Sequence, residues 1–327
     1  MNTRTLFRSP RQATTPGLLA GAPSANPLAL PSMVAALIRP GAWVSVVAAL
    51  LMSLPLRAGE PLSLLHLLPA PAAAGAAPAS LLLLGEVHDN AQQHALRLQA
   101  FDALLQRGAR PALLMEQFDR DRQDRIEHVR AQAPPGGSAT ATDADAQALI
   151  DAAATPGVRW HWDFYRPFIR LALEHGLPIL AANVSRKEAR RVSAQGLAAT
   201  GFDERVPADL VQAQAALIVA SHCGMVDPAQ SRRMASAQIA RDQFMARLLE
   251  QHRERGAVLL AGNGHVRRDI GVPRWLTPAT RTRTLAIGLL EAGAGDHAAF
   301  DHALNTPAQP REDPCAAMRG KASAGSA

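Results

Sequence analysis

The chain has 327 residues, of which 48% are hydrophobic and only 4% aromatic, enough for one sizeable domain with a mainly aliphatic core. Its formal net charge is +6, but residues 1–58 hold five arginines and no acidic residue, which leaves 29 Lys and Arg against 28 Asp and Glu in the remainder. A nucleic-acid-binding protein keeps its positive excess in the folded part, so the charge distribution excludes that class.

The N-terminal residues 1–58 are predicted to be an export signal region. An uncharged apolar stretch at 41–56 has Arg39 before it and a small-residue cleavage sequence, LRA, at its end. Pro55 ends this stretch short of the roughly 20 apolar residues that a membrane span needs, so we favour a cleaved signal over an uncleaved anchor or a buried helix. Met33 is an alternative start, because the chain from there keeps the same order. The expected location is the periplasm or the cell envelope.

Short apolar runs alternate with helical patterns through residues 78–302. The expected strands are 81–84, 112–116, 177–182, 257–261 and 282–290, and the longer expected helices are 92–106, 207–220 and 229–252. This alternation predicts a single α/β domain with a mostly parallel sheet flanked by helices. The Ala- and Pro-rich residues 59–77 are expected to be a linker, and residues 303–327 a disordered tail.

Polar side chains follow the ends of four of the expected strands. They are Glu86, His88 and His94 after the first, Glu116 after the second, Asn183 and Arg186 after the third, and Asn263 and His265 after the fourth. In an open parallel sheet the carboxyl ends of the strands share one edge, which is the usual place for a ligand. If these strands are neighbours, four distant segments converge on one site.

Each of these residues also has a purely structural interpretation. Glu86 and His88 lie two apart on extended chain, so they can share a metal, or the carboxylate can orient the imidazole. An isolated histidine is often only a hydrogen-bonded structural residue. Glu116 is also suited to cap the next helix. His265 follows Gly-Asn-Gly at a helix start, where backbone N–H groups can hold an anion, or it packs on the sheet.

The single tyrosine, Tyr165, lies in the aromatic segment WHWDFYRPF of an otherwise aromatic-poor chain. Such a cluster is either ordinary core or a flat apolar wall for a macrocycle. A tyrosinate can ligate ferric haem, and arginines such as Arg166 and Arg186 can pair with its propionates. A run of arginines is also typical of a solvated helix face.

The sequence SHCGM, expected as a turn between two helices, places three metal-ligand types side by side. His222 and Met225 are both of a type that ligates haem, although Met225 is equally suited to fill a gap between helices. Cys223 and Cys315 are far apart in the sequence and form neither a disulfide framework nor a zinc motif. We expect Cys223 to be a small buried residue rather than half of a disulfide.

Several segments, in order, resemble the ChaN-like haem-binding uptake family, which belongs with the wider Tiki and erythromycin-esterase-like folds. The matching segments span about residues 80–276 and are LLLLGEVHDN, LLMEQF, the aromatic Tyr-Arg-Pro segment, LPILAANVSR, SHCGM, ARDQFMARLL and LLAGNGHVRRDIGVPRWL. Each segment is short, and their combination is specific. The resemblance implies an α/β domain exported towards the bacterial envelope.

The resemblance also implies haem binding linked to iron acquisition, in subunits that pair as a homodimer around the cofactor. It implies a tyrosine iron ligand, for which Tyr165 is the sole candidate in this chain. It further implies a histidine that contacts a propionate, chosen from His88, His94, His222 and His265. The chain lacks the cysteine that lipoproteins of the family carry after the leader, so association with the membrane stays open.

Two functions are therefore predicted. The first is an exported haem-binding protein, not an enzyme, that handles haem or iron with Tyr165 on the metal. The alternative is a metal-dependent hydrolase, peptidase- or esterase-like, in which Glu86 or Glu116 is the general base and His88 and His265 bind or orient the reacting group. The sequence does not separate haem from another tetrapyrrole, since both present a flat apolar ring with acidic arms.

Overall fold

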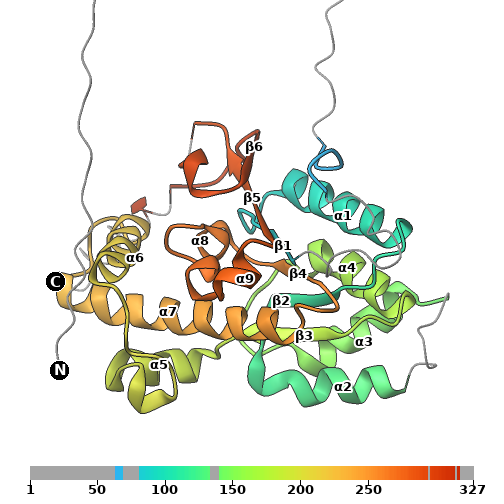
Figure 1. Ribbon diagram of the computed structural model, residues 1–327, viewed down its shortest axis with the longest axis horizontal. Helices are drawn as coiled ribbons and strands as arrows, with labels where there is room; N and C mark the ends of the chain where they lie inside the picture. Colours follow the sequence, from blue (N-terminus) through green and yellow to red (C-terminus); the bar gives the residue numbers. More distant parts are fainter. Residues whose placement is uncertain (1–62, 69–80, 133–139, 294, 314, 317–327) are drawn as a thin grey trace, which may run out of the picture. The chain divides into compact units, whose positions relative to one another are not determined.

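A parallel sheet of six strands forms the centre of the computed structural model, which describes residues 63–68, 81–132, 140–293, 295–313 and 315–316 (Figure 1). The strands are β1 (Leu81–Leu84), β2 (Ala112–Asp119), β3 (Ile179–Asn183), β4 (Ala257–Leu260), β5 (Thr284–Glu291) and β6 (His302–Thr306). Their order across the sheet is β3-β2-β4-β1-β5-β6, and every pair is parallel. The predicted α/β fold with a parallel sheet is confirmed.

The central strands are apolar because both of their faces are covered. Every residue of β1 and of β4 is buried, and Leu81 of β1 lies opposite Ala257 of β4 and Thr284 of β5. Strands buried on two faces are expected to be continuous apolar runs rather than alternating ones. This is why the short Leu-rich run at 81–84 was a sufficient signal for the strand at the centre of the sheet.

Helices cover both faces of the sheet. They are α1 (Ala91–Gln106), α2 (Gln123–Ala131), α3 (Asp143–Ala153), α4 (Trp162–Glu174), α5 (Arg186–Gln195), α6 (Ala208–Ser221), α7 (Pro228–Gln251), α8 (Asn263–Val266) and α9 (Pro278–Arg281). The first core cluster joins α1, α2, α3 and α4 to one face, with Leu82 and Leu84 of β1. The second joins α7 and residues 272–276 to the other face, with Leu81 and Leu83. A third cluster packs α5 and α6 on α7, outside the sheet.

Two boundaries differ from the sequence prediction. The tail was expected to begin at residue 303, but β6 extends to Thr306 and pairs with β5. The linker was expected to span 59–77, yet Leu64 and Leu68 within it are buried against the first core cluster. The linker was predicted from its Ala- and Pro-rich part, and the Leu-rich run at 62–68 is too short to give a periodic signal. Strand β6 is likewise only five residues long. The predicted export signal lies outside the described residues.

The segment after β6 is held by charge and by a covalent bond. Arg311 pairs with Asp89 and Glu291, and Cys315 forms a disulfide with Cys223, 92 residues away, with 5.6 Å between their Cα atoms. The expectation that Cys223 is not in a disulfide is therefore wrong, because partners distant in sequence carry no spacing signal. Among the described helices, none is long and apolar enough to cross a membrane.

Candidate functional site

The carboxylate of Glu86, just beyond β1, is the centre of a buried polar cluster. It is ion-paired with Arg97 of α1, which is itself fully buried. Tyr165 of α4 donates its hydroxyl proton to Glu86 Oε1 at 2.5 Å, and His88 Nδ1 lies 2.6 Å from the same oxygen. Burial favours the neutral acid, but Arg97, His88 and His94 together outweigh burial and lower the pKa of Glu86. Glu86 is therefore an anion that ties β1, α1 and α4 together.

His94 belongs to this cluster as a structural residue. Its ring stacks on Phe164 at 4.4 Å between centroids, and its Nε2 donates to the His88 carbonyl at 3.0 Å. Arg97 donates to its Nδ1 at 3.3 Å, which fixes the neutral tautomer. Burial and the charge of Arg97 lower the pKa of His94 to about 4. His94 thus has both nitrogens engaged and is neutral at neutral pH.

A second buried polar cluster, which we call the buried relay, joins α8, α7 and β2. His265 of α8 places Nδ1 2.6 Å from Oδ1 of Asp242 in α7, and its Nε2 lies 3.5 Å from Oε1 of Glu116 in β2. The other oxygen of Glu116 accepts the Gly262 backbone N–H at 2.8 Å. Burial opposes the imidazolium, but the charges of Glu116 and Asp242 outweigh it and raise the pKa of His265 to about 10. His265 is therefore charged at neutral pH and pairs with carboxylates on both sides.

His88 lies between the Glu86 cluster and the His265 cluster and is the exposed residue of the site. Its side chain is 47% exposed, and a Cβ on Gly262 would lie 3.1 Å from His88 Nε2, so the glycine leaves room for the ring in this position. Trp160 meets the ring edge-on at 4.9 Å between centroids. Burial works against its charge, but Glu86 and Glu116 outweigh burial and raise the pKa of His88.

The predicted convergence of strand-end residues is thus seen for Glu86, His88, Glu116 and His265, and it also includes His94 and Tyr165. Two members were missed, Arg97 and Asp242. Both are single charged residues on the buried face of a long helix. A charge on an otherwise buried helix face is the signal that could have found them, because such a group needs a partner.

Tyr165, the expected haem ligand, lies inside the buried polar cluster. The residue is fully buried, and its hydroxyl is committed to Glu86. Burial, together with the negative charge of Glu86, raises the pKa of Tyr165, so the tyrosinate that would bind iron is disfavoured. Iron binding by Tyr165 stays a prediction, and it requires the hydroxyl to leave Glu86.

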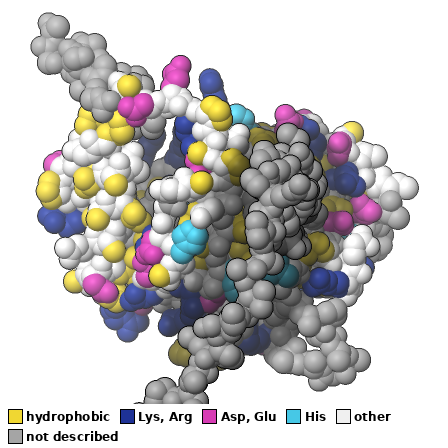
Figure 2. All heavy atoms as spheres, turned by 90° about the horizontal axis from the view of Figure 1, so that it is seen from above, with side chains coloured by type: hydrophobic (Ala, Val, Ile, Leu, Met, Phe, Trp, Pro, Cys, Tyr) yellow, Lys and Arg dark blue, Asp and Glu magenta, His cyan; other side chains and the backbone are white. Residues whose placement is uncertain are grey.

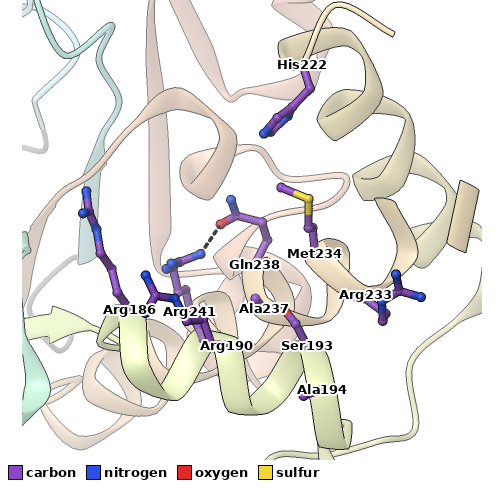
Figure 3. Close-up of a pocket in the computed structure, with 11 residues that line it drawn as sticks. Arg186, Arg190, Ser193, Ala194, His222, Arg233, Met234, Ala237, Gln238 and Arg241 are labelled. Atoms are coloured by element: carbon purple, nitrogen blue, oxygen red, sulfur yellow. Dashed lines mark hydrogen bonds between the residues drawn. The ribbon is translucent and has the colours of Figure 1, made fainter. Parts of the chain in front are cut away.

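Arg186 and His222 lie apart from this cluster, in a basic pocket between α5, α7 and the end of α6 (Figure 3). The pocket has a volume of about 850 Å³. Four arginines line it, Arg186, Arg190, Arg233 and Arg241, with His222 and Met234 beside them. No acidic side chain is among the described residues that line it. We call this cavity the basic pocket.

The arginines of the basic pocket are largely free to meet a ligand. Across the described parts of the chain, Arg186, Arg190 and Arg233 take part in no salt bridge and are exposed. Arg241 is held in place, donating to Asn183 Oδ1 at 3.0 Å and to Gln238 Oε1 at 3.1 Å. Burial lowers the pKa of Arg241, so an anion in the pocket would stabilise its charge. The charge of this lining suits an anionic ligand.

His222 presents one nitrogen to this pocket. Its Nδ1 lies 2.8 Å from the Ile218 carbonyl oxygen. A carbonyl only accepts, so Nδ1 carries the proton and Nε2 keeps a lone pair. Figure 3 shows the ring directed inward, towards Gln238 and Met234. This is the arrangement in which a protein histidine is held ready to bind a metal.

Comparison with known proteins agrees with the fold. A model of the family described as haem-binding uptake, Tiki superfamily, ChaN matches residues 72–276. The chain belongs to this family. The resemblance noted from the sequence segments is therefore confirmed, and the match covers the sheet up to β4 together with both candidate sites.

One solved structure shows the same fold, and a second is more distantly similar. The structure of cofacial haem binding to ChaN of Campylobacter jejuni is 19% identical, covers 69% of this chain and 87% of that chain, and has a TM-score of 0.54. A mutant of the erythromycin esterase EreC in its open conformation is 12% identical, covers 66% of this chain and 71% of that one, and has a TM-score of 0.39. No curated protein matches the chain in sequence.

The buried relay predicts a pH-dependent stability. Because the pKa of His265 is raised from about 6.5 to about 10, its stabilising contribution is complete below about pH 6.5 and is lost as the pH rises to about 10. We expect His265→Gln to lower the free energy of unfolding by about 3 kcal/mol at pH 6.5, because Glu116 and Asp242 lose their counter-charge. The difference from the wild type should shrink as the pH approaches 10, measured by urea unfolding.

The exposed His128 of α2 provides the control, and His128→Gln should leave stability unchanged at every pH. A difference between wild type and His265→Gln that is constant from pH 6.5 to 10 would contradict a charged His265.

Proposed function

We propose that the protein binds haem in the basic pocket and handles haem or iron in the bacterial envelope. The observation that carries the proposal is the cavity of about 850 Å³ bounded by four arginines and by His222. Haem is a flat apolar ring with two carboxylates and an iron that accepts a nitrogen ligand. Membership of the haem-binding uptake family supports the same ligand.

The lining of the pocket fits the chemistry of haem. Arginine pairs with carboxylates through two parallel hydrogen bonds, so Arg186, Arg190 and Arg241 are suited to the propionates. Small side chains, Ala189 and Ala237, leave room for a ring, and Met234 offers an adaptable apolar contact. Another tetrapyrrole with acidic arms shares these features, and the iron distinguishes haem from it.

His222 is the proposed iron ligand, in place of Tyr165. Its Nε2 lone pair faces the pocket, whereas the Tyr165 hydroxyl is buried on Glu86. Histidine is a common axial ligand of haem iron, and a backbone carbonyl on the opposite nitrogen fixes the ring and its tautomer. When bound, the haem would supply the iron centre, and this chain would supply the ligand and the counter-charges.

A second copy of the chain is the proposed partner around the cofactor. Two large apolar side chains near His222 are exposed. Leu217 lies on α6, and Met225 lies in the turn that follows this helix. Figure 2 shows apolar side chains on the side of the molecule formed by α6. Such a surface beside a ligand site is typical of a contact between proteins. The similar structure of ChaN of Campylobacter jejuni, which shows cofacial haem binding, supports the same proposal.

Export is part of the proposal and is supported by two features. The N-terminal region has the order of a signal peptide, and the disulfide between Cys223 and Cys315 is of a kind that persists in oxidising compartments outside the cytosol.

A second candidate function, hydrolysis, is favoured by one specific observation. His88 has Nδ1 on Glu86 at 2.6 Å and an exposed ring, which is the arrangement of a general base oriented by a carboxylate. The metal-dependent form of this hypothesis is weakened, because His265 has carboxylates at both nitrogens and is protonated at neutral pH. Among the described residues, no group of three potential ligands is arranged to hold a metal. In this candidate, His88 takes a proton from water, and the carboxylate of Glu86 stabilises the imidazolium that forms.

Haemin titration tests the main proposal. Wild-type protein should bind haemin saturably, and His222→Ala should weaken binding about tenfold or more and shift the Soret band, because the axial ligand is lost. Arg186→Gln should weaken binding by roughly tenfold without shifting the band, because a propionate loses a charged partner. The absorbance titration measures both effects, and mass determination with and without haemin tests the dimer.

Two control variants test whether the effect is specific to the basic pocket. Tyr165→Phe and His128→Ala should bind haemin like the wild type, since neither residue lies in the basic pocket. Loss of the wild-type spectrum in Tyr165→Phe, with His222→Ala unaffected, would return the iron ligand to Tyr165.

Export predicts a shortened mature protein. Protein recovered from the envelope of a bacterial host should begin near Gly59, and its intact mass should match that start. Recovery of the chain from the cytosol with its leader uncut would refute export by this route.

Hydrolysis predicts turnover of a chromogenic ester. Glu86→Gln should reduce that turnover by about 100-fold, because His88 loses its orienting carboxylate, and activity should rise with pH as His88 loses its proton. Haemin affinity should stay unchanged in this variant. Turnover no faster than in buffer, or equal in Glu86→Gln and wild type, would eliminate the candidate.

A further inference from the structure

The side-chain amide of Gln238, on α7, has its orientation set by a neighbouring cation. Arg241 Nη1 donates to Gln238 Oε1 at 3.1 Å, and Arg241 Nε donates to Asn183 Oδ1 at 3.0 Å. An arginine donates hydrogen bonds and accepts none, so each amide must turn its oxygen towards Arg241. The NH2 group of Gln238 therefore lies on the side of the amide that faces away from the guanidinium.

The donors that Gln238 and Arg241 keep free face the basic pocket. Both residues line the cavity, and Figure 3 shows the amide nitrogen of Gln238 on the side away from Arg241, towards His222. Within the described parts of the chain, no residue accepts a hydrogen bond from Gln238 Nε2 or from Arg241 Nη2. Both nitrogens are open to solvent rather than buried without a partner. They can therefore donate to a ligand in the cavity.

The charge of Arg241 is not fully compensated by the protein. Its two hydrogen-bond partners are neutral amides. Glu116, Asp242 and Asp119 favour its charged form without pairing with it directly, but burial outweighs them and lowers the pKa of Arg241. A half-buried cation of this kind is stabilised by an anion that hydrogen-bonds to it. Free donors around such a cation suit the oxygens of a carboxylate or a phosphate.

We propose that Gln238 and Arg241 form an oxyanion subsite in the basic pocket, and that Gln238 makes this subsite select a hydrogen-bond acceptor. The inference rests on the proposed ligand site and adds a specificity-determining residue to it. Arg241 supplies the charge and turns the amide, and the NH2 group of Gln238 supplies a donor. The occupant is one carboxylate or phosphate group, either a propionate of haem or a free oxyanion.

Gln238→Glu tests the proposal, because it keeps the length of the side chain and the oxygen that meets Arg241. The variant replaces the NH2 donor with a negatively charged acceptor, which repels an oxyanion and neutralises Arg241. Its new ion pair should preserve the melting temperature. We expect wild-type protein to bind inorganic phosphate saturably in a calorimetric titration and Gln238→Glu to show no binding. Gln238→Met, which removes the donor without adding charge, should bind phosphate about tenfold more weakly.

The matched control is Gln212→Glu, which adds the same charge to an exposed glutamine of α6 outside the pocket lining. It should bind phosphate like the wild type, which separates the loss of a donor from a change in net charge. Phosphate binding that is equal in Gln238→Glu and wild type would overturn the proposal, as would its absence from the wild type.

Haemin and its dimethyl ester identify the source of the oxyanion, because the ester has the ring and the iron but no carboxylate. If the subsite holds a propionate, Gln238→Glu should bind haemin about tenfold more weakly and the ester with unchanged affinity. Unchanged haemin affinity in this variant, together with lost phosphate binding, would identify a free oxyanion as the occupant. Equal weakening of haemin and ester would refute the subsite.

The phosphate titration also separates this inference from the proposed function. If wild-type protein binds phosphate but not haemin, the proposed function fails, and Gln238→Glu still decides whether the oxyanion subsite exists. If wild-type protein binds haemin but not phosphate, the proposed function stands and the subsite is refuted.

Discussion

The buried carboxylate of Glu86 is the interaction on which the arrangement of the domain depends. A charge removed from water must be paired, and here Arg97, Tyr165 and His88 all meet one carboxylate. These partners come from α1, α4 and the loop after β1, so one charge fixes how two helices lie on the central strand. The same demand explains why the single tyrosine is drawn into the core. Because its charges are already paired, this polar cluster is distinct from the basic pocket, where an acidic ligand can be held.

Helix α7 connects that cluster with the basic pocket. Arg241 faces the pocket, while the adjacent Asp242 is buried against His265. Successive residues on a helix point about 100° apart, so one helix can serve two neighbouring environments. The arginines of the basic pocket lie outside the sheet and have no acidic partner in its lining. The charges of the strand-end cluster are paired with one another. This contrast is the physical reason for assigning ligand binding to the pocket, and it leaves His88 as the cluster's exposed reactive group.

The sheet was predictable because its central strands are buried on both faces and therefore read as apolar runs, as at Leu81–Leu84. The cluster at the strand ends was predictable for the same reason, since parallel strands bring Glu86, Glu116 and His265 to one edge. The division into two sites was not predictable, because whether Tyr165 is core or ligand depends on packing of α4. The disulfide and β6 were also missed, since pairing between distant segments leaves no local pattern.

The central claim is that His222 binds haem iron in a pocket of arginines. Electron paramagnetic resonance of the ferric haemin complex tests it most directly, because histidine and tyrosinate ligands give different spectra. The account predicts a histidine-type signal in wild type and in Tyr165→Phe, and its loss in His222→Ala. A tyrosinate-type signal that persists in His222→Ala and disappears in Tyr165→Phe would contradict it.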